Sequence, residues 1–142
     1  MAQRKSSCAT LAQLRQQIFK QALLMHYWFL QDFEDYETGV RFRSAEKRLV
    51  TACRLYRRRL RIEEDVVGTL GESVLEAKIL DAALRIQYWL AQYKKNRDTQ
   101  TYRELTRAEG ELVFAGKPYR KKLGIPSHNT DDYLPALRRH FK

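Results

Sequence analysis

Four arginines are spaced so that they could act together on an anion. Arg54, Arg57, Arg58 and Arg61 stand at positions i, i+3, i+4 and i+7, and at about 100° per residue they share one face of a helix. A guanidinium group is always charged and presents a planar fork of donors, which suits carboxylates and phosphates. A solvated charged face is the plainer interpretation, and the pattern by itself leaves both open.

The helix that carries these arginines is predicted to begin near Ser44, a favourable N-cap residue. An apolar stripe runs opposite the arginines and consists of Ala45, Leu49, Ala52, Cys53, Tyr56 and Leu60. Glu63, Glu64 and Asp65 follow, and Gly68 and Gly71 mark a break. A second helix is predicted from about Ser73 to Lys94. Lys94, Lys95 and Arg97 stand at its carboxyl end, where cations complement the helix dipole.

The remaining elements are also helical by pattern, so we expect an all-α fold. One helix is predicted from Thr10 to about Leu30, followed by an acidic loop at 32–37 that Gly39 closes. Another begins at Thr101, with Glu104 completing a capping box, and stops at Gly116 and Pro118. A short last helix spans 132–141. These elements predict an N-terminal extension at 1–43, a helical bundle at 44–116 and a C-terminal tail at 117–142, and we expect both extensions to contact other subunits more than their own core.

Catalytic chemistry has no recognisable residue pattern in the chain. It contains no phosphate-binding glycine loop, no HExxH motif and no His/Cys cluster for a metal. His26, His128 and His140 are scattered, and Cys53 is expected to pack as a small apolar side chain in a reducing compartment. We therefore expect no catalytic residue, no metal and no enzyme activity. The net charge of +10 instead predicts an anionic partner.

The segment LYRRRLR at Leu55–Arg61 has the extended form LYRxxLR. Downstream, Tyr93-Lys94-Lys95-Asn96-Arg97-Asp98 precedes an acidic, leucine-bearing segment. Together these segments resemble the LYR-motif (complex I LYR-like) family of mitochondrial proteins over about half of the chain. Three features depart from the family pattern: Tyr93 stands where Phe is usual, the interval from Arg57 to Tyr93 is long, and the motif is far from the amino terminus.

The resemblance implies a three-helix antiparallel LYR-type bundle, here with an additional N-terminal helix and an extended C-terminal tail. It implies binding to mitochondrial acyl carrier protein, whose acidic surface would meet the basic helix. The expected contacts are Arg54, Arg57, Arg58 and Arg61, joined by Lys94, Lys95 and Arg97. The chain has no cofactor of its own in this interpretation. The carrier's acyl-4′-phosphopantetheine would enter the bundle near Leu55, Tyr56, Leu60 and Tyr93.

The resulting hypothesis is a non-catalytic accessory subunit of a respiratory complex, with complex I favoured, on the matrix side of the inner membrane. The acid-free stretch from Met1 to Gln31 resembles a mitochondrial targeting segment, although an ordinary basic helix explains it equally. The longest apolar run, Ala22–Leu30, is too short to span a membrane. An LYR-type assembly factor for iron–sulfur delivery or mitoribosome maturation is one alternative. A nucleic-acid-binding protein is another, which the placing of aromatic residues in apolar runs disfavours.

Overall fold

The computed structural model describes residues 9–31, 35–62 and 74–141, apart from the side chains of 61, 62 and 74. The described residues form helices and include no strand, which confirms the all-α prediction. The helices are α2 (Leu11–Phe29), α3 (Tyr36–Ile62), α5 (Val74–Lys95), α6 (Thr99–Leu123) and α7 (Tyr133–His140). No described helix is both long enough and apolar enough to cross a lipid bilayer.

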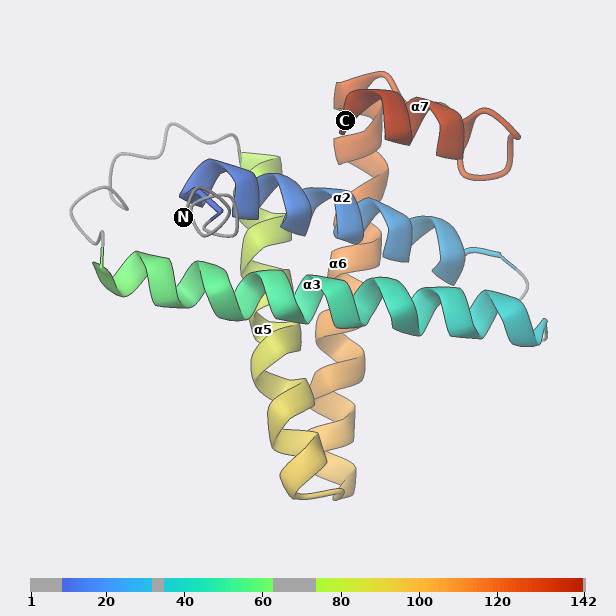
Figure 1. The fold of residues 1–142 in the computed structure, drawn as a ribbon. Helices are drawn as coiled ribbons and strands as arrows, with labels where there is room; N and C mark the ends of the chain where they lie inside the picture. The colour runs from blue at the N-terminus through green and yellow to red at the C-terminus, as the bar shows by residue number, and fades with distance from the viewer. Residues whose placement is uncertain (1–8, 32–34, 63–73, 142) are drawn as a thin grey trace, which may run out of the picture.

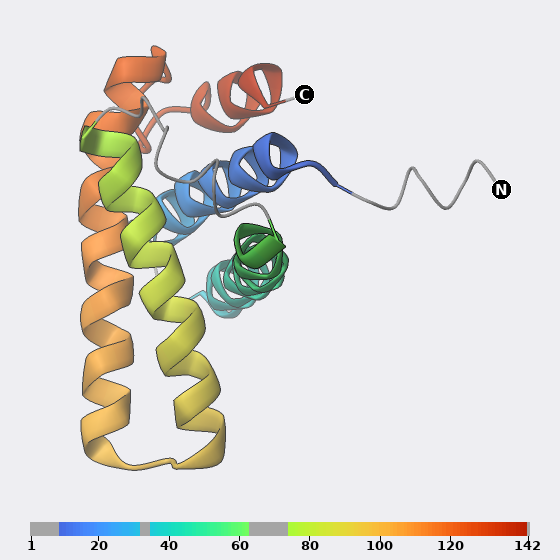
Figure 2. The same cartoon turned by 90° about the vertical axis from the view of Figure 1, so that its left-hand side faces the viewer.

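The helices form two hairpins that cross each other. Helices α2 and α3 lie side by side as one antiparallel pair, and α5 and α6 form the other (Figure 1). Seen from the side, the first pair is viewed almost end-on while the second runs along its full length (Figure 2). Residues 44–116 therefore do not form the single antiparallel bundle that we expected, because α3 lies across the α5–α6 hairpin and not alongside it.

Helix α2 begins where the sequence predicts. The Oγ1 atom of Thr10 accepts a hydrogen bond from the backbone N–H of Gln13 at 3.1 Å, and the Gln13 Oε1 atom accepts one from the Thr10 N–H at 2.8 Å. This reciprocal cap satisfies two donors that the helix itself cannot satisfy. The helix then buries most of one side, including Ile18 and Leu23, against the other helices.

The start of α3 differs from the prediction. It begins at Tyr36 and not near Ser44, so Gly39 lies inside the helix and the expected acidic loop is partly helical. Asp35 explains the early start, because its carboxylate accepts hydrogen bonds from the Glu37 N–H and the Thr38 hydroxyl, both at 3.3 Å. The expected break after this helix, at Gly68 and Gly71, lies outside the described residues.

Helix α6 passes through the residues that were expected to stop it. Its N-cap is Asp98, whose carboxylate accepts from the Thr101 N–H at 2.7 Å, so the predicted cap at Thr101 is wrong. It continues beyond Gly116 and Pro118 and ends at Gly124, whose φ of 79° suits glycine. The continuation is favoured because the next turn of the helix places Tyr119 in the core.

The core joins all of these elements, so the expected extensions belong to it. The predicted boundaries at 43/44 and 116/117 fall inside α3 and α6. Phe19 and Tyr133 are among the largest fully buried side chains, and Tyr133 donates a hydrogen bond to the Leu23 carbonyl at 2.6 Å. The tail residues Ile125, Tyr133, Leu137 and Phe141 are likewise buried. The tail was expected to lie on the domain or on a neighbour, and Tyr133 packs against α2 of the same chain.

Candidate functional site

The second half of α3 has the two faces that its sequence predicts. Cys53 and Tyr56 are buried, with Tyr56 only 1% exposed, and Leu60 is half-buried against the core. Arg54 and Arg58 are exposed on the other side. The expected inward position of Tyr56 and Leu60 is therefore confirmed. Leu55, which the resemblance placed beside an acyl chain, is instead 39% exposed.

Arg57 is held by the neighbouring helix. Its Nε atom donates to the Gln87 Oε1 atom at 2.5 Å, and its Nη2 atom donates to the Leu84 carbonyl at 3.0 Å. Both acceptors lie on α5. Arg57 therefore has a different role from the neighbouring arginines. It fixes α3 across α5, so it has fewer donors left for a partner.

Arg54 and Arg58 remain available for an external anion. Neither forms a hydrogen bond or ion pair with the described part of the chain. They are one helical turn apart and therefore project on the same side. The side chain of Arg61, the fourth arginine of the predicted set, lies outside the described residues. Three of the four predicted arginines thus have described side chains. Two of these are free, and one is bound to α5.

The turn between α5 and α6 supplies the other predicted cations. Lys94, Lys95 and Arg97 are all exposed there. The Arg97 guanidinium lies 5.4 Å from the centre of the Tyr93 ring, a cation–π contact. Tyr93 also packs against Tyr102 at 5.5 Å between ring centres. Tyr93 therefore supports the turn, and nothing places it beside a bound acyl chain.

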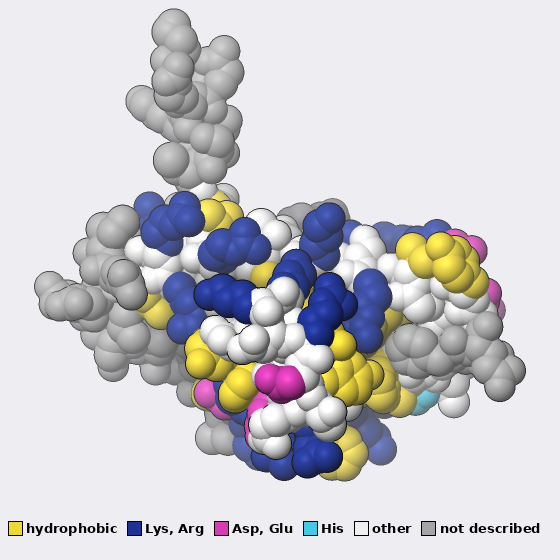
Figure 3. Space-filling model, turned by 90° about the horizontal axis from the view of Figure 1, so that it is seen from below, with side chains coloured by type: hydrophobic (Ala, Val, Ile, Leu, Met, Phe, Trp, Pro, Cys, Tyr) yellow, Lys and Arg dark blue, Asp and Glu magenta, His cyan; other side chains and the backbone are white. Residues whose placement is uncertain are grey.

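The two basic groups are connected through α5, to which Arg57 is hydrogen-bonded and whose last turn contains Lys94 and Lys95. Lys94 follows Gln87, the Arg57 acceptor, by seven residues, which is about 10 Å along a helix at about 1.5 Å per residue. Viewed from below Figure 1, Lys and Arg side chains gather over the middle of the visible face, with few acidic ones among them (Figure 3). We call Arg54, Arg58, Lys94, Lys95 and Arg97 the basic face.

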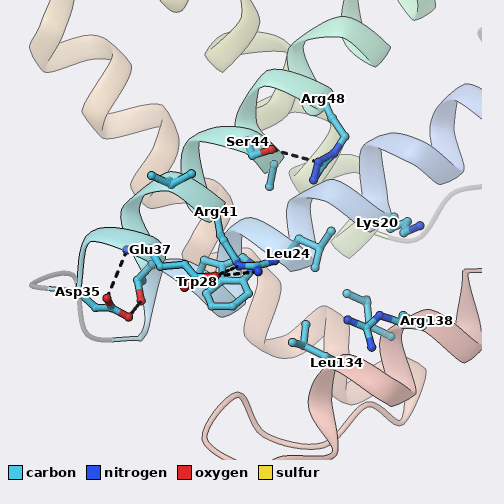
Figure 4. A pocket seen from close by; sticks show the side chains of 14 residues that line it. Lys20, Leu24, Trp28, Asp35, Glu37, Arg41, Ser44, Arg48, Leu134 and Arg138 are labelled. Carbon is cyan, nitrogen blue, oxygen red and sulfur yellow. Dashed lines mark hydrogen bonds and ion pairs between the residues drawn. The ribbon is translucent and has the colours of Figure 1, made fainter.

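The interior beside Tyr56 is filled by side chains. Cys53, Ile79, Ala83 and Ile86 are all fully buried between α3 and α5. Hollows lined by described residues lie elsewhere. One, of about 870 Å³, lies between α2, the first half of α3 and α7 (Figure 4), and another, of about 420 Å³, lies between α5 and α6 next to Phe114. Neither of these two hollows includes Tyr56, the expected entry point of an acyl chain.

A buried charged cluster joins α3 to α6, and the sequence analysis missed it. The Arg43 Nη1 atom donates to Glu46 at 2.6 Å and to Glu109 at 2.9 Å, and both carboxyl groups are nearly inaccessible. Burial, and then the adjacent Glu46, raises the pKa of Glu109 to about 8, although Arg43 opposes the rise. Helical spacing could have found both acids. For both Glu46 and Glu109, the residue four positions earlier and the residue three positions later in the same helix are buried in the core. This spacing places each acid on the buried face of its helix.

Two other reactive side chains are buried. The Nδ1 atom of His26 lies 2.7 Å from the Val113 carbonyl, and burial lowers the pKa of His26 below its ordinary value. Burial also raises the pKa of Cys53 to about 12, so its nucleophilic thiolate form is scarce. Both side chains therefore act as packing groups here. Neither the prediction of a reducing compartment nor the expected lack of catalysis is tested by this packing.

Comparisons with known proteins add no functional assignment. Among the residues that the structure describes, no group of His, Cys, Asp and Glu side chains is arranged to hold a metal ion. No family model, no curated protein and no solved structure matches the chain. The functional proposal therefore depends on the basic face and its geometry.

Proposed function

We propose that this chain is a non-catalytic adaptor that binds the acidic surface of an acyl carrier protein through its basic face. One observation carries the proposal: Arg54 and Arg58 have no partner within the described chain, and Lys94, Lys95 and Arg97 are exposed at the end of the helix to which the intervening Arg57 is bound. The resemblance of LYRRRLR to the LYR motif supports the choice of acyl carrier protein among acidic proteins.

The support beneath the basic face favours binding. Tyr56 is buried under α3, and Arg57 fixes the same turn to α5 through two hydrogen bonds. The cations are therefore presented by packed helices, so their backbone does not have to become ordered when a partner arrives. Complementary charge also raises the rate of encounter and disfavours basic partners.

The proposal requires surface docking only. An acyl chain inserted beside Tyr56 would have to displace packed side chains, and displacement in a well-filled core carries a cost. The resemblance also implies a place on the matrix side of a respiratory complex, with complex I favoured, or a role as an assembly factor. Co-purification distinguishes these two, since an accessory subunit stays with a large membrane complex and an assembly factor does not.

The test is a pulldown of acyl carrier protein by the wild-type chain and by an Arg54→Glu/Arg58→Glu variant. We expect the variant to bind at least tenfold more weakly, because carboxylates would then face carboxylates. Arg57 is left intact, since its loss would disturb the contact between α3 and α5. Circular dichroism checks that the variant folds, and Glu keeps good helix propensity.

The matched control is Lys121→Glu/Lys122→Glu, which changes the net charge equally at exposed positions near the end of α6. Binding by this control should stay close to wild type. Undiminished binding by the folded arginine variant would contradict the proposal, as would salt-dependent binding to a nucleic-acid duplex with none to acyl carrier protein.

A further inference from the structure

A groove on another part of the molecule has a cationic end. Its volume is about 870 Å³, and it is bounded by α2, the first half of α3 and α7 (Figure 4). Four cations line it, and one of them, Arg41, is paired with Glu37. The other three come from different helices: Lys20 from α2, Arg48 from α3 and Arg138 from α7. Residues so distant in sequence meet here only because α7 folds back over the α2–α3 pair.

These three cations have no carboxylate partner within the described chain. The only hydrogen bond of Arg48 to a described residue goes to the Ser44 hydroxyl at 3.2 Å, and Lys20 and Arg138 make none. Positive charges that line one groove repel one another, and a bound anion would relieve that repulsion. The groove therefore has unsatisfied capacity for negative charge.

The acids of the groove are already occupied and lie away from Lys20 and Arg138. Glu37 forms an ion pair with Arg41 at 2.8 Å, and Asp35 caps the start of α3. In Figure 4, Asp35 and Glu37 lie on one side of the pocket, while Lys20 and Arg138 lie on the other. The groove is thus polarised along its length.

Apolar side chains lie between these two ends. Leu24 and Leu134 are half-buried, and Leu137 is only 1% exposed. Trp28 is half-buried on α2 with the Arg41 guanidinium 5.5 Å from its ring centre. A ligand that contacts the cations would therefore also cover an apolar surface.

We propose that this groove binds an anionic amphiphile, a carboxylate or phosphate head on an apolar chain. The head would lie among Lys20, Arg48 and Arg138, and the chain would lie along Leu24 and Leu134 toward Trp28. The volume falls in the range of about 300–1,000 Å³ that is typical of small-molecule sites. The proposal is independent of the proposed function, because none of these residues belongs to the basic face.

The test uses the full chain with Trp89→Phe, which leaves Trp28 as the only tryptophan. Its fluorescence is followed while dodecanoate is added below the concentration at which it aggregates. We expect saturable binding that decanoate reproduces about fifteen-fold more weakly, since each buried methylene contributes about fourfold. Dodecyltrimethylammonium, which has the same chain and the opposite charge, should not bind.

Variants separate the head from the chain. Lys20→Glu/Arg138→Glu should weaken dodecanoate binding at least tenfold, and Lys121→Glu/Lys122→Glu, with the same change in net charge, should leave it unaltered. Arg48→Glu tests the third cation independently if the double variant fails to fold. Equal binding of the cationic amphiphile, full binding by the folded variants, or a response only to anionic phospholipid vesicles would overturn the proposal. Failure here leaves the pulldown with acyl carrier protein unaffected.

Discussion

The buried pair of Glu46 and Glu109 should make the stability of this protein depend on pH through one proton. Glu109 is nearly inaccessible, and its pKa is raised from 4.5 to about 8, first by burial and then by the neighbouring Glu46. At neutral pH the Glu109 carboxyl is therefore mostly protonated in the folded chain and ionised in the unfolded chain. Glu109→Gln imitates the protonated form, because an amide also offers both a donor and an acceptor.

The sign and size follow from this difference. The folded chain holds the proton more tightly, so the stabilisation is complete below pH 4.5 and is lost as the pH rises through about 8. Between these values the wild type loses about 1.4 kcal/mol per pH unit from Glu109. His26, whose pKa is lowered, has the opposite effect but acts only below about pH 6.5. From pH 6.5 to 8 we therefore expect a loss of about 2 kcal/mol from Glu109.

The assay is urea unfolding followed by circular dichroism at several pH values and constant ionic strength. At pH 7, Glu109→Gln should be more stable than wild type by up to about 3 kcal/mol, because only the wild type loses stability as the pH rises from 4.5 to 7. The variant should lack the decline between pH 6.5 and 8 that the wild type shows. Glu37→Gln, the same change at a side chain that is 64% exposed, should keep the wild-type decline. If Glu109→Gln also keeps the wild-type decline, the reasoning about the buried proton is wrong.

Three further experiments test the packing by urea unfolding or thiol labelling. Gly116→Ala should lower the free energy of unfolding by about 1–3 kcal/mol, because the new Cβ would lie 2.8 Å from His26 ring atoms. Gly110→Ala, whose new Cβ would have nothing within 4 Å, should instead raise it by about 0.5–1 kcal/mol. Equal effects of the two substitutions would refute the close approach. Arg57→Ala should cost about 1 kcal/mol through its two lost hydrogen bonds, and an unchanged unfolding midpoint would argue against the contact. Cys53, in a chain whose other cysteine is replaced by serine, should react with a thiol reagent only when urea unfolds the protein, and rapid labelling of the folded chain would contradict its burial.

Local patterns in the sequence were sufficient for much of the helical structure. The Thr10 cap, the two faces of α3 and the cations at the end of α5 were predicted because capping and helical spacing involve residues within a few turns. The exposed positions of Arg54 and Arg58 followed for the same reason. The extended motif LYRRRLR at Leu55–Arg61 also suggested a partner, and that suggestion remains a proposal.

Tertiary contacts decided what local patterns could not. Gly116 and Pro118 were expected to end α6, but the burial of Tyr119 beyond them outweighs their low helix propensity. Arg57 was expected to face solvent with its neighbours, and only the crossing of α3 over α5 brings its donors to Gln87. The same limit applies to the groove between α2, α3 and α7, whose cations come from three separate helices. The sequence determined which faces of each helix are apolar or basic, while the packing of those helices decided which charges are paired and which are left for a partner, because pairing depends on contacts between distant segments.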